Sequence, residues 1–298
     1  MDKSNNSLAY AAAIIYALVI GFSFLFVKLA LTVSDPFDTL AHRFTASFIA
    51  ISLPVLLGRI QLSSNLQDIR RILPLALLYP AIFFGFQISG LVYTTSSEAG
   101  IILASTPIFT LFLATYFLKE KTNPRQSISL AVSVAGVIYI LVMKGISFEN
   151  TQMTGTLLLL LSSLSFAGYS VLARPLTQQF KPLELTFIML LIGFLTFNLL
   201  ALLRHGLDGT IGQYFQPLTN QVFLVSIFYL GVLSSLGTSW LSNYALSKIE
   251  ASKMSVFGNL ATLISMIAGV IFLQEQLEYY HIIGAIMIIA GILGTNLL

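Results

Sequence analysis

The chain has 298 residues, of which 56% are hydrophobic and only 9% are charged. Soluble domains carry about 25% charged residues, and the mean hydropathy of this chain is +0.88. This composition excludes an ordinary soluble enzyme, a nucleic-acid-binding protein and a disordered scaffold. The chain has no cysteine, which excludes disulfide bonds, a thiol nucleophile and a cysteine-ligated metal. We therefore interpret it as a multi-pass membrane protein.

Ten stretches of the chain are long and apolar enough to cross a bilayer as helices. Each has about 20 mainly apolar residues, the length that a helix needs to span a hydrocarbon layer roughly 30 Å thick. The first lacks a clear cleavage site, so we expect a retained helix rather than a signal peptide. The predicted spans are 8–31, 37–57, 72–93, 99–118, 126–143, 155–173, 183–203, 222–246, 254–273 and 279–298.

Lysine and arginine residues are distributed unequally between the two sides of these spans. If the N-terminus is cytoplasmic, eleven of them fall in cytoplasmic segments and two, Lys144 and Arg204, fall in external segments. The remaining two, Lys28 and Arg43, fall inside spans. A cytoplasmic excess of positive charge is typical of membrane proteins. We therefore expect a multi-pass protein of the cell (inner or plasma) membrane with both termini in the cytoplasm.

The two halves of the chain resemble each other. A shift of 146 residues aligns Lys28 with Arg174, and a shift of 155 residues aligns Glu120 with Glu275. Each half holds five predicted spans, an odd number, so the second half enters the membrane from the opposite side. Solute sites in such proteins lie near the midplane, between the repeats. The predicted fold is an all-α membrane protein of ten transmembrane helices, arranged as two inverted five-helix repeats over residues 1–145 and 150–298.

Short motifs at corresponding places in the two halves carry a family resemblance. They are Gly21–Lys28, Leu40–Phe44 and Phe117–Glu120 in the first half, and Phe272–Glu275 in the second. In this order and spacing they resemble the drug/metabolite transporters of the EamA type over nearly the whole chain. The resemblance implies a five-plus-five helix transporter that exports, or sometimes takes up, small metabolites such as amino acids. It does not imply a particular substrate.

Aromatic and polar side chains share faces on several predicted helices, as a cavity for amphipathic solutes requires. Lys28 lies two helical turns after Gly21, on a face of small residues, so we expect it to line an external vestibule. Thr262 stands where the first half has Pro107. The alternatives are plain packing for the aromatic residues, an interhelical hydrogen bond for Asn259 and a snorkelling anchor for Lys28. The candidate substrate-binding residues are Lys28, Phe83, Gln87, Tyr169, Trp240, Asn243, Asn259 and Thr262.

Two further titratable residues lie inside a predicted span. An arginine that faces lipid at depth costs about 2.5–3.5 kcal/mol or more, so we expect Arg43 to point inward. Its likeness to a general feature of the family implies a structural role, and a charge in the cavity is the alternative. His42 is the only imidazole away from the ends of a predicted span and is a candidate coupling group, although the adjacent Arg43 disfavours its charged form. Since no Asp or Glu lies deep inside a predicted span, facilitated passage is the simplest mechanism.

Enzyme motifs are missing from the sequence. It contains no G-x-S-x-G, H-E-x-x-H, P-loop or glycine-rich dinucleotide turn. Histidines 42, 205 and 281 do not have metal-ligand spacing, so we expect no catalytic residue, no metal and no cofactor. The expected partners are a small-molecule substrate and the lipid bilayer, not nucleic acid, with a homodimer left open. A membrane-embedded enzyme and a non-transporting structural or receptor membrane protein remain as alternatives.

Overall fold

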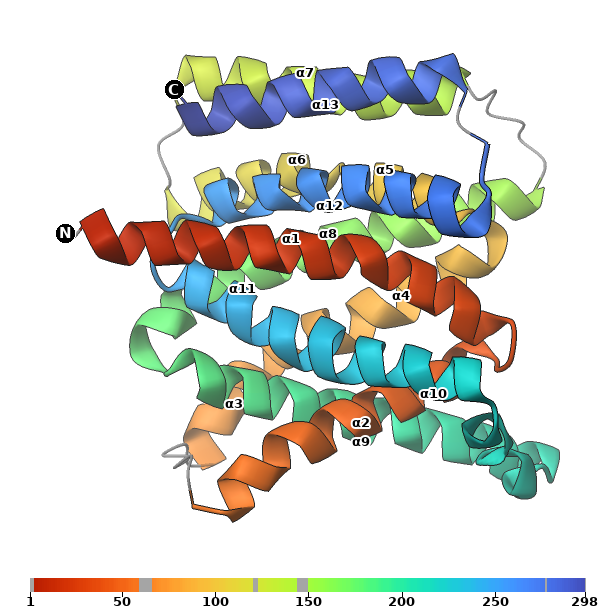
Figure 1. The fold of residues 1–298 in the computed structure, drawn as a ribbon. Coiled ribbons are helices and arrows are strands. Elements are labelled where there is room, and N and C mark those ends of the chain that lie inside the picture. Colours follow the sequence, from red (N-terminus) through yellow and green to blue (C-terminus); the bar gives the residue numbers. More distant parts are fainter. Residues whose placement is uncertain (1–2, 59–65, 120–122, 144–149, 277, 298) are drawn as a thin grey trace.

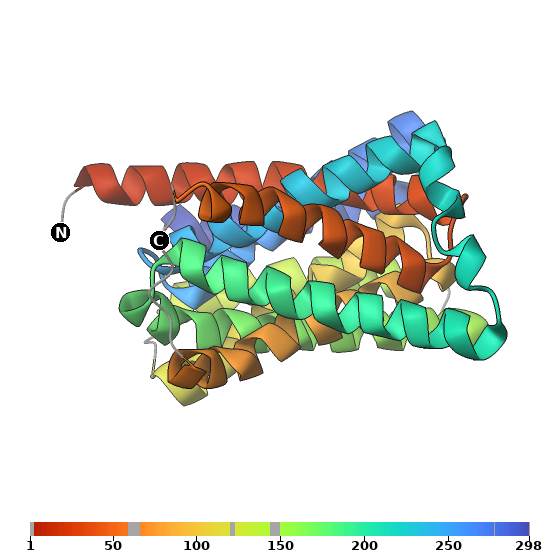
Figure 2. The ribbon, with the colours of Figure 1, turned by 90° about the horizontal axis from the view of Figure 1, so that it is seen from below.

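The structure is a computed structural model, and it describes residues 3–58, 66–119, 123–143, 150–276 and 278–297. These residues form helices and no strand. The helices run roughly parallel to one another in an elongated bundle (Figures 1 and 2). The α-helices are α1 (Lys3–Leu31), α2 (Pro36–Leu56), α3 (Leu66–Ala76), α4 (Phe83–Tyr93), α5 (Ser96–Leu103), α6 (Thr106–Leu113), α7 (Pro124–Met143), α8 (Asn150–Gln179), α9 (Pro182–Asp208), α10 (Gln221–Phe228), α11 (Thr238–Leu246), α12 (Ala251–Leu273) and α13 (Tyr279–Leu297). Five short turns of different pitch are η1 (Leu77–Ile82), η2 (Ala114–Leu118), η3 (Ile211–Gln213), η4 (Gln216–Thr219) and η5 (Tyr229–Gly237).

Eight helical segments of the described chain are long and apolar enough to cross a membrane. They coincide with eight of the ten predicted spans. The other two predicted spans, 126–143 and 279–298, correspond to α7 and to α13, and α13 contains a shorter apolar segment, Tyr279–Gly291. Large apolar side chains cover the outside of the bundle, including Phe112 at 72% and Ile271 at 63% exposure. Lipid accommodates such a surface and water does not, so the chain is a multi-pass membrane protein.

Several helices extend beyond the predicted spans. α8 runs past residue 173 to Gln179, and α9 runs past residue 203 to Asp208, so the connection that follows α9 covers only residues 209–220. α2 begins beside Asp35, whose carboxylate accepts hydrogen bonds from the backbone N–H groups of the first helical turn. Such a cap satisfies donors that have no partner inside the helix. Hydropathy alone underestimates these polar helix ends.

The predicted span 72–93 is a broken helix. It consists of α3, η1 and α4, and Tyr79 has the extended backbone angles φ −140° and ψ 112° within η1. Pro80 explains the break, because proline lacks the N–H that a continuous helix needs and its ring clashes with the preceding turn. The corresponding span 222–246 also contains a wider turn, η5, between α10 and α11.

The predicted span 99–118 is interrupted after α5. α6 starts at Thr106 with Pro107 in its first turn, a position where the missing N–H costs nothing. In the second half of the chain, Thr262 takes the place of Pro107 and α12 continues without a break. The proline of the first half lies at the interruption, and threonine at the corresponding place keeps the N–H that a continuous helix uses.

The bundle is layered. α7 and α13 pack on each other as an outer layer, followed by α12 with α5 and α6, while α2 and α9 pack together on the opposite side (Figure 1). Where α4 meets α8, a Cβ on Gly90 would lie 3.1 Å from the Gly155 carbonyl oxygen, and a Cβ on Gly155 would lie 3.2 Å from that of Gly90. Small residues are what allow backbones to approach this closely in a membrane. Both termini lie at the same end of the bundle (Figure 2).

Candidate functional site

A narrow cavity lies between α1, α4, α5, α8 and α12, with η1 and α6 also contributing to its wall. Its empty volume, including the part open to solvent, is about 550 Å³. Eight of its lining residues are aromatic or polar, and the rest are aliphatic, methionine or glycine. None of the residues assigned to its wall is charged. The eight residues are Tyr16, Phe24, Tyr79, Phe83, Gln87, Thr106, Phe166 and Thr262.

Aromatic rings form a continuous part of the cavity wall. The centroids of Tyr79, Phe83 and Phe166 lie 5.2 to 5.4 Å from one another. Tyr16 stacks on Phe166 at 6.5 Å. These rings come from α1, η1, α4 and α8, so the wall is formed only when four segments assemble. Clustered rings of this kind offer a broad apolar surface to a solute.

Three polar side chains interrupt this apolar wall. The Thr106 hydroxyl donates to the Leu103 carbonyl oxygen at 2.6 Å, and the Thr262 hydroxyl donates to the Gly100 carbonyl oxygen at 2.7 Å. Both hydroxyls are therefore already engaged in helix contacts. The Gln87 side chain, by contrast, has no hydrogen-bonding partner among the described residues, although it is only 7% exposed. Its amide offers both donors and an acceptor to a solute.

Three of the predicted site residues thus line the cavity, namely Phe83, Gln87 and Thr262. Tyr169 and Asn243 lie next to it instead. The Tyr169 ring lies 4.7 Å from that of Tyr79, and its hydroxyl donates to Asn243 Oδ1 at 2.9 Å. Tyr169 and Asn243 therefore pack on the side of the aromatic wall that faces away from the cavity.

Asn259 and Lys28 form hydrogen bonds with other helices and do not line the cavity. Asn259 Nδ2 donates to Ser133 Oγ at 2.6 Å, which joins α12 to α7 as the interhelical alternative requires. Its Oδ1 is buried with no partner among the described residues. Lys28 Nζ donates to the carbonyl oxygen of Leu91 at 2.7 Å and to that of Thr94. Neither Asn259 nor Lys28 is among the residues that line the cavity.

The expectation that Trp240 contacts the cavity is wrong. Its side chain is 47% exposed on the outside of α11, and it is absent from the lining of the cavity. The buried face of this helix carries Thr238, Ser239 and Ser242. Because successive side chains on a helix point about 100° apart, the tryptophan that follows Ser239 faces outward.

Arg43 is buried, as predicted, with 1% of its surface exposed. Its Nε donates to Ser235 Oγ at 2.7 Å and its Nη2 donates to Ser234 Oγ at 3.1 Å. The guanidinium carbon lies 4.1 Å from the centroid of the Phe84 ring, a cation–π contact. These contacts join α2 to η5 and α4, in agreement with a structural role.

His42 contacts the segment that connects α9 and α10. Its Nε2 lies 2.8 Å from the Tyr214 carbonyl oxygen, and its ring stacks on the Tyr214 ring at 4.5 Å. Burial raises the pKa of Tyr214 to about 12, so its hydroxyl stays protonated. That hydroxyl donates to Asn198 Oδ1 at 2.7 Å. His42 does not line the cavity.

The sequence interpretation missed part of the cavity wall. Tyr16, Ile20 and Phe24 line the cavity from α1 and are spaced by four residues. This spacing places the three side chains on one helical face, so the sequence alone could have predicted that they line a common surface. The adjacent small residues of α1 instead indicated a packing face. Phe166 had no comparable signal, because its role depends on how α8 is rotated against α4.

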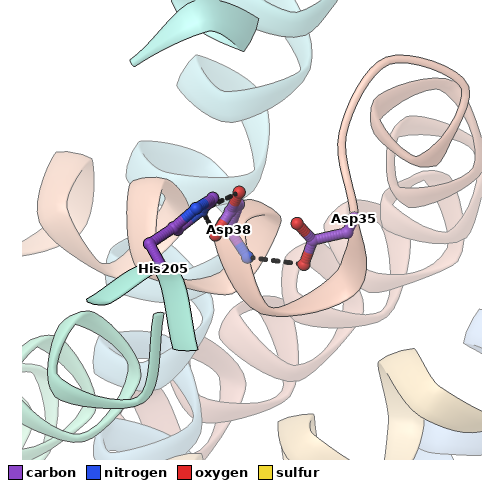
Figure 3. Close-up of side chains that lie close together, drawn as sticks. All are labelled: Asp35, Asp38 and His205. Carbon is purple, nitrogen blue, oxygen red and sulfur yellow. Dashed lines mark hydrogen bonds and ion pairs between the residues drawn. The ribbon is translucent and has the colours of Figure 1, made fainter. Parts of the chain in front are cut away.

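A second, open polar pocket lies at the end of the bundle where α9 ends, with an empty volume of about 1040 Å³. Inside it, His205 Nε2 lies 2.8 Å from Asp38 Oδ2, and Arg204 Nη2 lies 2.6 Å from Asp35 Oδ2. Figure 3 shows His205 and Asp38 in contact, with the Asp38 backbone N–H donating to Asp35 at 3.2 Å. Burial by itself would raise the pKa of the Asp35 carboxyl, but hydrogen bonds from Arg204 and from the Asp38 backbone hold it below its usual value.

Sequence analysis predicts no metal site from the spacing of the histidines, and the structure brings one of them, His205, close to two aspartates. Asp35, Asp38 and His205 each offer a ligand atom, and these atoms lie within 4.8 Å of one another. All three side chains already have protein partners, however. His205 Nδ1 lies 2.7 Å from Thr210 Oγ1, and Arg204 supplies positive charge to Asp35. The cluster therefore joins α2 to α9 and to the following loop through these protein contacts.

Comparison with known proteins relates the whole chain to one family. A family model described as the EamA-like transporter family matches residues 7–142 and 153–297. "Uncharacterized transporter YcxC" of Bacillus subtilis (strain 168) is 54% identical over 297 residues, which is 100% of this chain and 95% of that protein. An "Uncharacterized transporter" of Archaeoglobus fulgidus is 25% identical over 98% of each chain. One solved crystal structure has a TM-score of 0.73 at 17% identity, covering 98% of this chain and 97% of its own, a likeness of fold alone. The chain belongs to the EamA-like transporter family.

Proposed function

We propose that this transporter carries small amphipathic organic solutes that are neutral or zwitterionic, such as amino acids, through the cavity described above. The observation that carries the proposal is the lining itself, in which aromatic rings share the wall with the free amide of Gln87 and none of the described lining residues is charged. A solute with a net charge would lose its hydration there without gaining a counter-ion, which is costly. A solute with an apolar group and a polar group can place the first against the aromatic rings and the second at the Gln87 amide.

The proposed mechanism is alternating access between two inverted repeats of five helices each, residues 1–145 and 150–298. Contacts that recur at the predicted shifts support it. Lys28 donates to the Leu91 carbonyl oxygen and Arg174 donates to that of Leu246, and these pairs differ by 146 and 155 residues. α4 packs on α8 as α11 packs on α1. Glu120, which the same shift pairs with Glu275, lies outside the described residues. Two similar halves of opposite orientation would supply one gate at each membrane face.

Direction and energy source complete the proposal. Export is the proposed direction, and it rests on the family resemblance. The termini share one end of the bundle, which supports the same side of the membrane for both (Figure 1). The proposed side is the cytoplasm, because the lysine and arginine residues concentrate in the segments on that side. Because no carboxylate or imidazole is among the residues assigned to the cavity wall, the proposed mechanism is passage down the solute gradient without proton exchange.

Release of metabolites from cells that overproduce the chain tests this function. Mass spectrometry of the medium should show neutral or zwitterionic amphipathic solutes accumulating above the level of cells that carry an empty vector. Release restricted to anionic or strongly cationic solutes would contradict the proposed substrate class. No change in release or uptake of any solute would contradict transport by the cavity.

A pair of variants tests whether the cavity is the route. Gln87→Leu removes a free amide at nearly constant volume and should change the rate or the solute preference by about tenfold, as the loss of one hydrogen bond to a bound solute predicts. Trp240→Leu, on the exposed side of α11, is the matched control and should leave both unchanged. Equal effects of the two variants would place the route elsewhere.

A further inference from the structure

The turn between α4 and α5 is held by a lysine from α1. Lys28 Nζ donates to the Leu91 carbonyl oxygen at 2.7 Å and to that of Thr94, at the carboxyl end of α4. Carbonyl groups at a helix end have no partner inside the helix and carry partial negative charge. An ammonium group there satisfies two of them and offsets that charge.

The same turn is held from its other side by a carboxylate that follows α12. Glu275 accepts hydrogen bonds from the backbone N–H of Ser96 at 3.0 Å, from that of Ser97 at 3.1 Å and from the Ser97 hydroxyl. These donors lie in the first turn of α5, where a negative charge is favoured. Lys28 and Glu275 thus bind the same short turn through hydrogen bonds, one with a positive and the other with a negative charge.

The backbone around Glu275 is shaped for this contact. Gln274 has a left-handed backbone with φ 54°, and the Glu275 N–H returns to the Gly269 carbonyl oxygen at 3.1 Å. A Cβ on Gly269 would lie 2.4 Å from Glu275 Oε2 and 2.7 Å from Ser97 Oγ. Only glycine at this position leaves room for the carboxylate to reach α5.

The contact lies just outside the cavity. The helices that it joins, α1, α4, α5 and α12, all contribute to the cavity wall. One helical turn is about 5.4 Å along the axis. Three residues of the contact lie one turn beyond a lining residue, and these pairs are Lys28 and Phe24, Leu91 and Gln87, and Ser96 and Gly100.

We propose that Lys28 and Glu275 are positioning residues that form the gate at this end of the cavity, an inference that rests on the proposed transport function. To open this end, the turn between α4 and α5 must move away from α1 and α12, which breaks the hydrogen bonds to both charged groups. Each charged group lies at a helix end and becomes hydrated when the turn moves away. The gate is therefore stable when closed and reversible when opened.

A reporter cysteine tests this gate, because the chain has no cysteine of its own. Ile20→Cys places a thiol in the cavity wall, and a membrane-impermeant maleimide is added to purified protein in lipid vesicles, at the face that carries Glu275. A Gln213→Cys reporter in the exposed loop at the same end identifies that face. Glu275→Gln and Lys28→Met should each raise the labelling rate of the cavity thiol about tenfold, as expected when a closed state loses 1.4 kcal/mol against an open one.

Glu278→Gln is the matched control, since it removes the same charge from an exposed side chain three residues along. Its labelling rate should equal that of the parent. Unchanged labelling in both gate variants, or an equal rise in the control, would overturn the gate. If Glu275→Gln does not fold, Ser97→Ala keeps the charge and removes one hydrogen bond, and it should raise labelling about twofold; unchanged labelling there would also overturn the gate.

Labelling requires no solute, so the gate and the transport function fail separately. Unchanged labelling with intact solute flux would reject Lys28 and Glu275 as the gate and leave the function standing. Faster labelling in a protein that moves no solute would reject transport and leave the conformational role of the two residues standing.

Discussion

At the scale of single residues, the charged groups near the membrane are held by specific partners. Arg43 is neutralised by no described carboxylate but has two serine hydroxyls and the Phe84 ring. Arg204 makes a bidentate contact with Asp35, in which Nη1 donates to Oδ1 at 2.7 Å and Nη2 donates to Oδ2 at 2.6 Å. A two-pronged contact of this kind is stronger and more directional than a single ion pair. Such contacts hold helix ends in place where hydrophobic packing alone does not.

The pair of Asp35 and Arg204 predicts a stability that depends on pH. Since the folded-state pKa of Asp35 is lowered, its contribution is present above the unfolded value of about 3.9 and is lost as the pH falls through the folded value. Arg204→Gln should cost about 1 kcal/mol at pH 7, because both side chains are partly exposed, and less at pH 3, where the carboxyl of the unfolded chain is largely protonated. Thermal unfolding in detergent at the two pH values measures this. An equal loss at both would mean that Arg204 contributes by packing and not by charge.

At the scale of helices, hydropathy predicted where the spans lie but not where they break. The reason is physical, since bilayer thickness sets the length of an apolar stretch while Pro80 and Pro107 decide its continuity. The rotation of each helix was harder to predict. Gln87 lies in the cavity wall, on a face of α4 that polar and aromatic residues share. Trp240 does not, because polar residues occur on several faces of α11 and only packing selects the buried one.

Close helix contact predicts opposite effects for two glycines of α4. A Cβ on Gly90 would lie 2.7 Å from Leu159 Cγ, so Gly90→Ala should destabilise the protein by about 1–3 kcal/mol through overpacking. Nothing lies within 4 Å of a Cβ on Gly85, so Gly85→Ala should be neutral or should stabilise the helix by about 0.5–1 kcal/mol. The midpoint of thermal unfolding in detergent compares them. A larger loss for Gly85→Ala would contradict the packing of α4 on α8.

At the scale of the whole molecule, self-comparison of the sequence indicated which segments correspond, and the paired contacts of Lys28 and Arg174 follow that alignment. The polar cluster at the end of α9 was beyond prediction. Asp38 and His205 are 167 residues apart, and only the packing of α2 on α9 brings them together. The cavity was anticipated in chemical character, as aromatic and amide groups, but its closure by α1 and α8 depends on the assembled bundle.

The number and direction of the predicted spans determine on which side of the membrane a fused reporter protein should lie. A reporter fused at residue 150 should lie outside the cell and one fused after residue 298 should lie in the cytoplasm, because five predicted spans separate the two positions. Alkaline phosphatase and fluorescent-protein fusions measure the two sides. Fusions that report the same side would contradict the inverted arrangement of the two repeats.

Counterflow in proteoliposomes is the most direct test of solute transport through the cavity by alternating access. Vesicles containing the purified chain are preloaded with an unlabelled solute found in the release screen and are exposed to a trace of the labelled solute at equal pH. Labelled solute should accumulate transiently inside, and Gln87→Leu should alter its rate while Trp240→Leu should not. Accumulation that occurs only under an imposed pH gradient would contradict the uncoupled mechanism, and no accumulation under either condition would contradict transport itself.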